Sequence, residues 1–339
     1  MKKMRNIAKI ALFLVLFVTI HAGLRQVYYA LITPYDSYLS RQQAFNKHEG
    51  VYDVVVLGDS HAQVGVVPKE LGSAANLSQL GEAYIVRYYK LRYNLRKNPG
   101  KIQTLVMPMD LHSFSPFWGE NFNIVSSSRY VNFLDYMWHT GVTSRVLRSF
   151  VHYHLFPYAD CTDDIYEALP ASQKEIRRKA MVRFVRSLAE TGATEEQIDN
   201  MMTTHYGEER LWLSQKGLLF FNRVKALCQT ENIRVIFVRF PVSEPYVEAA
   251  SQVVPIEEFD AMTQDLVDAW PGAVLLDYRE LYFDREDLFT DLNHLNAKGA
   301  EHFSRHFRED LVRLGVFERE PETPKRKTTP PARTYALPH

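Results

Sequence analysis

A serine stands directly after a short apolar run that has the composition of a buried strand. Residues 51–57 read VYDVVVL and are followed by Gly58, Asp59, Ser60 and His61. A serine at the carboxyl end of a central parallel strand can present its hydroxyl in the crevice beyond the sheet, and the glycine allows a sharp turn there. Because a serine hydroxyl is a weak nucleophile without a general base, the chain must supply such a base elsewhere.

The best candidate for that base is His294, which follows Asp291 in the segment TDLNHLN. At this spacing the carboxylate can accept the imidazole Nδ1 proton across a turn and leave Nε2 free to accept the proton of Ser60. G-D-S and D-x-x-H each arise often by chance. Their order along the chain, one after the first strand and the other before the last helix, favours serine-dependent acyl chemistry.

Alternating strand-like and helical segments must position these residues. Four short apolar runs lie at residues 51–57, 102–107, 233–240 and 273–276. Helical stretches at 82–98 and 213–230 separate them. This alternation predicts an α/β fold, a parallel sheet between two layers of helices. Since sites in such sheets form beyond the carboxyl ends of the strands, Ser60, Asp110 and Pro241 are expected to line one crevice.

The N-terminus has the pattern of an export signal. Four basic residues, Lys2, Lys3, Arg5 and Lys9, precede an apolar run at 10–20. We predict that residues 1–24 are an uncleaved signal anchor, the alternative being a signal peptide removed before Ala22. The positive-inside rule then gives a single-pass protein of the inner (cytoplasmic) membrane whose catalytic domain is extracytoplasmic, in the periplasm.

The rest of the chain divides by composition. We predict a connector at 25–50, a catalytic domain at 51–317 and a disordered, proline-rich tail at 318–339. Within the domain, about 121–204 is helix-rich and is interpreted as a helical insertion, either a lid or ordinary sheet-covering helices.

Composition and motif content exclude several function classes. Forty basic residues balance forty acidic ones, so no overall field favours nucleic acid. The chain has no P-loop and no G-x-G-x-x-G motif, so no cofactor is predicted. Cys161 and Cys228 form either one disulfide or two buried thiols. No metal site is predicted, because the remaining histidines lack ligand partners at suitable spacing; these are His112, His152, His154, His302 and His306.

Three sequence blocks resemble those of SGNH (GDSL-like) hydrolases: GDSH at 58–61, NLSQLG at 76–81 and DLNH at 291–294. The resemblance implies a flavodoxin-like, three-layer fold with Ser60, Asp291 and His294 as catalytic residues. It also implies that the backbone N–H groups of Ser60 and Gly81 bind the oxyanion. The asparagine of the family's third block does not carry over, because MPMDLH places Asp110 there.

This departure directs the resemblance towards anchored, extracytoplasmic acyltransferases such as the D-alanyl transfer protein of teichoic acid modification. The shared features are the anchor, the serine block and a Pro-Val motif after a late strand, here Pro241-Val242. The resemblance implies O-acylation of an envelope polysaccharide or related polymer through an acyl-Ser60 intermediate, beside a membrane-bound O-acyltransferase partner. An esterase with the same triad and a non-catalytic envelope scaffold remain as alternatives.

Three further residues are candidate substrate-binding groups. His61 either lines the pocket or faces solvent, and Asp110 lies just beyond the second apolar run. Arg239, near the end of the run at 233–240, either binds a carboxylate or phosphate in the crevice or forms a structural ion pair.

Overall fold

The computed structural model describes residues 2–32, 37–116, 130–131, 133–140, 147 and 187–317. A five-stranded sheet forms the centre of the folded body, with strand order β2-β1-β3-β4-β5 and every described pair parallel. Its strands are β1 (Tyr52–Val56), β2 (Ala74–Asn76), β3 (Ile102–Pro108), β4 (Arg234–Arg239) and β5 (Val274–Asp277). The predicted parallel α/β fold is confirmed.

The apolar runs form strands because the sheet is covered on both faces. Val54, Val55 and Val56 are fully buried, as a run without polar alternation requires. Strand β2 was not predicted, since Ala74–Asn76 is too short and too small in its side chains to stand out. It pairs in register with β1, which aligns Asn76 with Val56 and places the segment after it beside Ser60.

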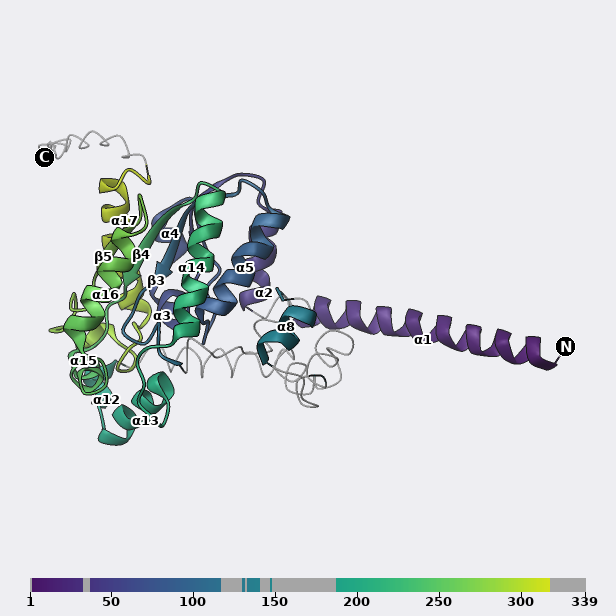
Figure 1. The fold of residues 1–339 in the computed structure, drawn as a ribbon, viewed down its shortest axis with the longest axis horizontal. Helices are drawn as coiled ribbons and strands as arrows, with labels where there is room; N and C mark the ends of the chain where they lie inside the picture. Colours follow the sequence, from purple (N-terminus) through teal and green to yellow (C-terminus); the bar gives the residue numbers. More distant parts are fainter. Residues whose placement is uncertain are drawn as a thin grey trace, which may run out of the picture.

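Helices complete the layers, as Figure 1 shows. They are α3 (Ser60–Gly65), α4 (Pro68–Leu71), α5 (Tyr84–Lys97), α14 (Gln215–Thr230), α15 (Glu244–Ser251), α16 (Ile256–Asp268) and α17 (Ala297–Arg313), with a short 3₁₀ turn at Glu286–Leu288. Helix α5 packs against α14, and α17 packs against α3 and α4. The first pair is joined by aromatic contacts such as Tyr89 with Phe220.

The N-terminal helix α1 (Lys2–Ile32) projects from the folded body in Figure 1. Its 24-residue stretch Arg5–Tyr28 has a mean hydropathy of 2.2, and none of it is buried. The helix is long and apolar enough to be a membrane anchor or a signal sequence.

Helix α2 (Ser37–Lys47) lies within the segment 25–50 that was predicted as a connector. Tyr38 and Phe45 are buried, and the Phe45 ring stacks on Tyr52 at the start of β1. The segment therefore belongs to the folded body, because two aromatic anchors stabilise a helix that its weak periodicity does not indicate.

Part of the predicted helical insertion is described, as α8 (Phe133–Thr140), α12 (Leu188–Thr191) and α13 (Glu195–Tyr206). Its remaining residues, including Cys161, lie outside the described ranges, as does the predicted tail at 318–339. Cys228 is a buried free thiol, and burial raises its pKa to about 12.

Candidate active site

Ser60 is the first residue of α3, immediately beyond the carboxyl end of β1. The side chain of Asp59 caps this helix by accepting a hydrogen bond from the backbone N–H of His61 at 3.1 Å. This cap explains why the chain turns into a helix at the serine. The turn places the Ser60 hydroxyl at the end of the sheet, with 8% of the residue exposed.

Gly58 is required at this turn by close packing rather than by a left-handed backbone. A Cβ atom on Gly58 would lie 2.6 Å from Cδ of Pro108 and 2.8 Å from Cβ of Ala62. The end of β1 therefore approaches the end of β3 too closely for any side chain. This differs from the expectation that the glycine serves a sharp turn.

His294 and Asp291 lie side by side, as the spacing predicts. The imidazole Nδ1 is 3.0 Å from both carboxylate oxygens of Asp291. Burial would raise the pKa of Asp291, but the hydrogen bond and charge of His294, with two backbone N–H donors, outweigh it and lower the pKa. Nε2 of His294 is buried and has no hydrogen-bond partner among the described residues. It is available to accept a proton.

A cavity of about 430 Å³ joins these residues. One wall consists of Ser60, Leu80, Gly81, Asp291 and His294. The other comes from α12, α13 and the turn between them, with Leu188, Gly192, Asn200, Met201 and His205. The described end of the insertion therefore covers the site. Leu80, at the rim, is 60% exposed.

The segment 76–81, which carries Gly81, is held rigidly beside the serine. Nδ2 of Asn76 donates to the carbonyl oxygens of Ala62 and Val66 in and after α3, at 2.8 and 2.9 Å. Arg41 of α2 donates to the carbonyls of Asn76 and Ser78. Gly81 itself has φ of +67°, a left-handed conformation that favours glycine. Its position is therefore set from α2 and α3 together.

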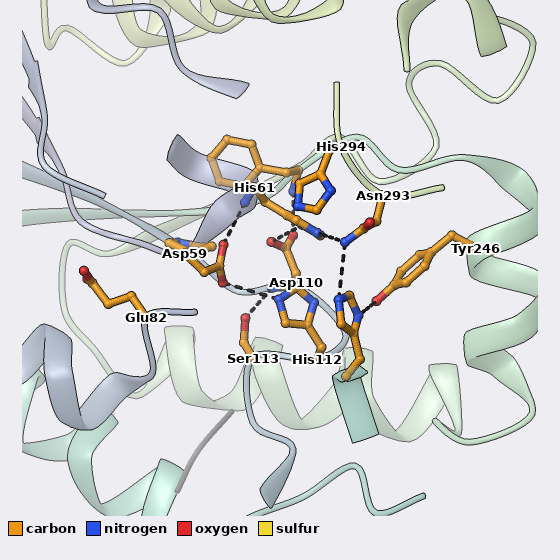
Figure 2. Close-up of polar contacts among 12 residues, drawn as sticks. Asp59, His61, Glu82, Asp110, His112, Ser113, Tyr246, Asn293 and His294 are labelled. Atoms are coloured by element: carbon orange, nitrogen blue, oxygen red, sulfur yellow. Dashed lines mark hydrogen bonds and ion pairs between the residues drawn. The ribbon is translucent and has the colours of Figure 1, made fainter. Parts of the chain in front are cut away.

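A second histidine–carboxylate pair lies behind the cavity wall. Nδ1 of His61 is 2.9 Å from Oδ2 of Asp110, and Oδ1 of Asp110 accepts the backbone N–H of Phe240 at 2.7 Å. Burial alone would lower the pKa of His61, but the charge and hydrogen bond of Asp110 outweigh it and raise the pKa. The His61 ring is also in edge contact with His294, at 5.4 Å between centroids. Figure 2 shows these side chains converging.

Asp59 and His112 extend this buried cluster. Oδ2 of Asp59 is 3.0 Å from Arg87 and 3.4 Å from Nε2 of His112. Burial would raise the pKa of Asp59, but these two partners outweigh it and hold the pKa well below its usual range. Asp59, His61, Asp110 and His112 each offer a ligand atom, all within 4.8 Å of one another. The prediction that His112 lacks a carboxylate partner is wrong, because residues distant in sequence meet at the strand ends.

Both carboxylates of this cluster already have hydrogen-bond or ion-pair partners. Asp59 forms an ion pair with Arg87 and caps helix α3. Asp110 is hydrogen-bonded to His61 and to the backbone N–H of Phe240. A cation bound there would face the guanidinium of Arg87 and displace these partners. We therefore describe the cluster as structural support for the residues on either side of Ser60.

The side chain of Asn293 connects His61 to His205. Its Nδ2 atom is 2.8 Å from Nε2 of His61 and 3.3 Å from Nε2 of His205, whose Nδ1 is 2.8 Å from the Tyr246 hydroxyl. Figure 2 shows Asn293 between these groups. Sequence reasoning missed Asn293 and His205. Asn293 could have been noticed because it lies between Asp291 and His294, whereas no sequence signal marks His205.

None of the three candidate substrate-binding residues lines the cavity, which corrects that assignment. His61 and Asp110 are buried and bonded to each other behind the cavity wall. Arg239 is 5% exposed, and its guanidinium contacts Asp277 at 2.6 Å and Asp260 at 3.0 Å. These contacts favour the alternative of a structural ion pair. Pro241 is likewise not part of the cavity lining, so only Ser60 of the three strand-end residues reaches it.

Because of its buried histidines, the folded chain is expected to become less stable towards unfolding in mild acid. Burial lowers the pKa of His205 well below its usual value, and burial also lowers that of His112. Below about pH 6.5 the unfolded chain therefore binds protons that the folded chain excludes, so acid favours unfolding. His61, whose pKa is raised, has the opposite effect, because the folded chain binds its proton more readily than the unfolded chain does, and it partly offsets this loss.

We expect His205→Gln to reduce the slope of unfolding free energy against pH, between pH 6.5 and 5.5, by up to about 1.4 kcal/mol per pH unit. Urea unfolding at each pH measures it. His302→Gln, outside the cluster, is the control. An unchanged slope in His205→Gln would show that His205 is protonated equally in both states.

Comparison with known proteins adds little to this geometry. No protein-family model and no curated protein matches the chain. Among solved structures, a protein provisionally described as a platelet activating factor from Streptococcus pneumonia is 10% identical with a TM-score of 0.38. The match covers 88% of this chain and 99% of that one. A likeness this weak assigns neither fold family nor activity.

Proposed function

We propose that this chain is a membrane-tethered serine acyltransferase of the SGNH type that forms an acyl-Ser60 intermediate. One observation carries the proposal. Ser60, Gly81, Asp291 and His294 line a single cavity, Asp291 holds Nδ1 of His294, and Nε2 is left without a partner among the described residues. The Asp291 contact orients the imidazole towards this cavity, and the proposal requires Ser60 to move into hydrogen-bond reach of Nε2, a contact that the described residues do not make in this structure.

In the proposed first step, Oγ of Ser60 attacks the carbonyl carbon of an ester or thioester, and Nε2 of His294 takes the hydroxyl proton. The tetrahedral intermediate collapses, the bond to the leaving group breaks, and the leaving group departs with the proton from His294. Asp291, whose pKa is lowered, stays ionised and stabilises the imidazolium between these events.

The oxyanion is proposed to bind to the backbone N–H groups of Ser60 and Gly81. Ser60 is in the first turn of α3, where N–H groups have no partner within the helix. Gly81 lines the same cavity, and hydrogen bonds of Asn76 fix the start of the segment that carries it. Donors fixed in this way contribute several kcal/mol to lowering the barrier. Asp110 is not proposed as a donor, because it is bonded to His61 behind the wall.

The acceptor in the second step distinguishes a transferase from an esterase. The proposed acceptor is a hydroxyl of an envelope polysaccharide or related polymer, which attacks the acyl-Ser60 carbonyl while His294 takes its proton. The cavity of about 430 Å³, roofed by α12 and α13, can hold an acyl chain and one sugar. With α1 as an anchor the body would work outside the cytoplasm, beside a membrane-bound acyl donor or O-acyltransferase.

An acyl-trapping experiment tests this proposal. The full chain in detergent is mixed with p-nitrophenyl acetate, quenched in acid and digested, and the peptide that carries Ser60 is expected to gain an acetyl group by mass spectrometry. Adding a glycan with free hydroxyls is expected to raise p-nitrophenol release severalfold, because deacylation by an alcohol competes with water. A fully methylated glycan is the matched control.

Two alternatives correspond to the other outcomes. An acetylated Ser60 peptide with no response to either glycan indicates an esterase with the same residues. An unmodified Ser60 peptide with no p-nitrophenol release refutes the catalytic proposal and leaves a non-catalytic envelope scaffold, for which the replaced asparagine of the third block is the supporting observation.

A further inference from the structure

Helix α8 is fixed to the folded body by one of its faces. Asp135 is 3.0 Å from Arg92 of α5, and Nε2 of His139 is 2.8 Å from the hydroxyl of Tyr89 on the same helix. The His139 ring also packs edge-on against Phe220 of α14. The two polar contacts are four residues apart, which is one helical turn, so they define the inner face of α8.

A neighbouring face of α8, about 100° round the helix from the inner face, exposes two large apolar side chains. Leu134 is 77% exposed and Trp138 is 85% exposed, and they are also one turn apart. Exposing a tryptophan and a leucine together is unfavourable in water, because the apolar surface of neither side chain is buried. Tryptophan is the residue that concentrates where a bilayer meets water, because its ring is apolar and its N–H is polar.

Two basic residues of α14 lie near the inner face of α8. Lys216 and Arg223 of α14 are close enough to His139 to lower its pKa, together with the larger effect of burial. Arg223 is exposed and lies over the ring of Phe220 at 4.6 Å. An exposed apolar pair beside cations matches a phospholipid surface, which offers acyl chains and phosphate groups at adjacent depths.

Contacts place α8 at the end of the body where α1 leaves it. Tyr38, at the start of α2, is in edge contact with Tyr130, just before α8, with ring centroids 6.3 Å apart. Lys90 of α5 lies over both rings. In the view of Figure 1, α8 is drawn near the end of α1 that joins the folded body. A bilayer that contains the apolar stretch of α1 would therefore pass close to α8.

We propose that Leu134 and Trp138 insert into the headgroup boundary of the bilayer that α1 spans, so that α8 is a second membrane contact. A single helix leaves the body free to rotate, whereas two contacts fix which side of the body faces the lipid. The inference rests on α1 being retained as an anchor, and it is independent of the reaction at Ser60.

Tryptophan quenching by brominated lipid tests this contact. The full chain is placed in nanodiscs whose phosphatidylglycerol carries bromine near the glycerol end of the acyl chain, and fluorescence is compared with unbrominated discs. We expect wild type to be quenched and Trp138→Phe to lose at least about half of that quenching. Trp212→Phe, which replaces a half-buried tryptophan packed on Phe259, is the matched control and should keep it.

Each other result overturns a defined part of the inference. A chain that does not co-elute with nanodiscs refutes the anchor and the α8 contact with it. Co-elution with no quenching, or with equal quenching in Trp138→Phe, refutes the α8 contact and leaves the anchor. An acylated Ser60 peptide in either case shows that the proposed reaction survives.

Discussion

Ser60→Ala is expected to lower the rate of p-nitrophenyl acetate turnover by at least about 10⁴-fold, because the remaining groups have no nucleophile to activate. Substrate binding and the proposed oxyanion donors would remain in this variant, so a small residual rate is expected. The substitution removes only the hydroxyl oxygen of the residue at the first position of α3. The helix cap by Asp59 does not involve it, so the fold should be unchanged. The same substitution in cells should abolish acylation of the envelope polymer.

Two measurements make this result specific. Circular dichroism should show equal helix content in Ser60→Ala and wild type. Ser251→Ala, which removes a hydroxyl that bonds only to the Glu248 carbonyl on the surface, should retain full turnover. Turnover by Ser60→Ala within tenfold of wild type would mean that another group is the nucleophile. Unchanged envelope acylation in cells would refute acyl transfer to that polymer by Ser60.

Arg87→Met is expected to reduce the free energy of unfolding by about 3–5 kcal/mol. Arg87 is 1% exposed, and its NH2 group is 3.0 Å from both Oδ2 of Asp59 and the carbonyl of Glu82. Methionine keeps much of the volume but leaves the Asp59 carboxylate buried without its cation. Urea unfolding followed by circular dichroism, with the full chain in detergent, measures the loss.

Arg96→Met provides the matched control, since it makes the same change at an exposed position of the same helix and should cost less than about 0.5 kcal/mol. Combining Arg87→Met with Asp59→Asn removes both charges and should recover part of the loss. If Arg87→Met alone changes the unfolding free energy by less than about 1 kcal/mol, Asp59 is not ionised in the folded chain and the ion pair is refuted.

Sequence reasoning succeeded where a pattern is local and repeated. The β-branched runs of β1, β3 and β4 stand out because both faces of each strand are buried. β2, with the sequence AAN, and α2, with weak periodicity, carry no such signal. β2 forms because it pairs with the edge of β1, and α2 forms because its aromatic residues make buried contacts. Local propensity therefore could not reveal them.

The amino-acid sequence by itself determined the parallel α/β order, the apolar N-terminal helix and the Asp291–His294 pair, because each depends on residues close together in the chain. Only the tertiary structure decided that His205 of the insertion meets Asn293, that Asp59, His61, Asp110 and His112 form one buried cluster, and that Arg239 is paired away from the cavity. Those contacts join segments that are far apart in sequence, and their partners are selected by packing and by the need to satisfy buried charge, which no local spacing encodes.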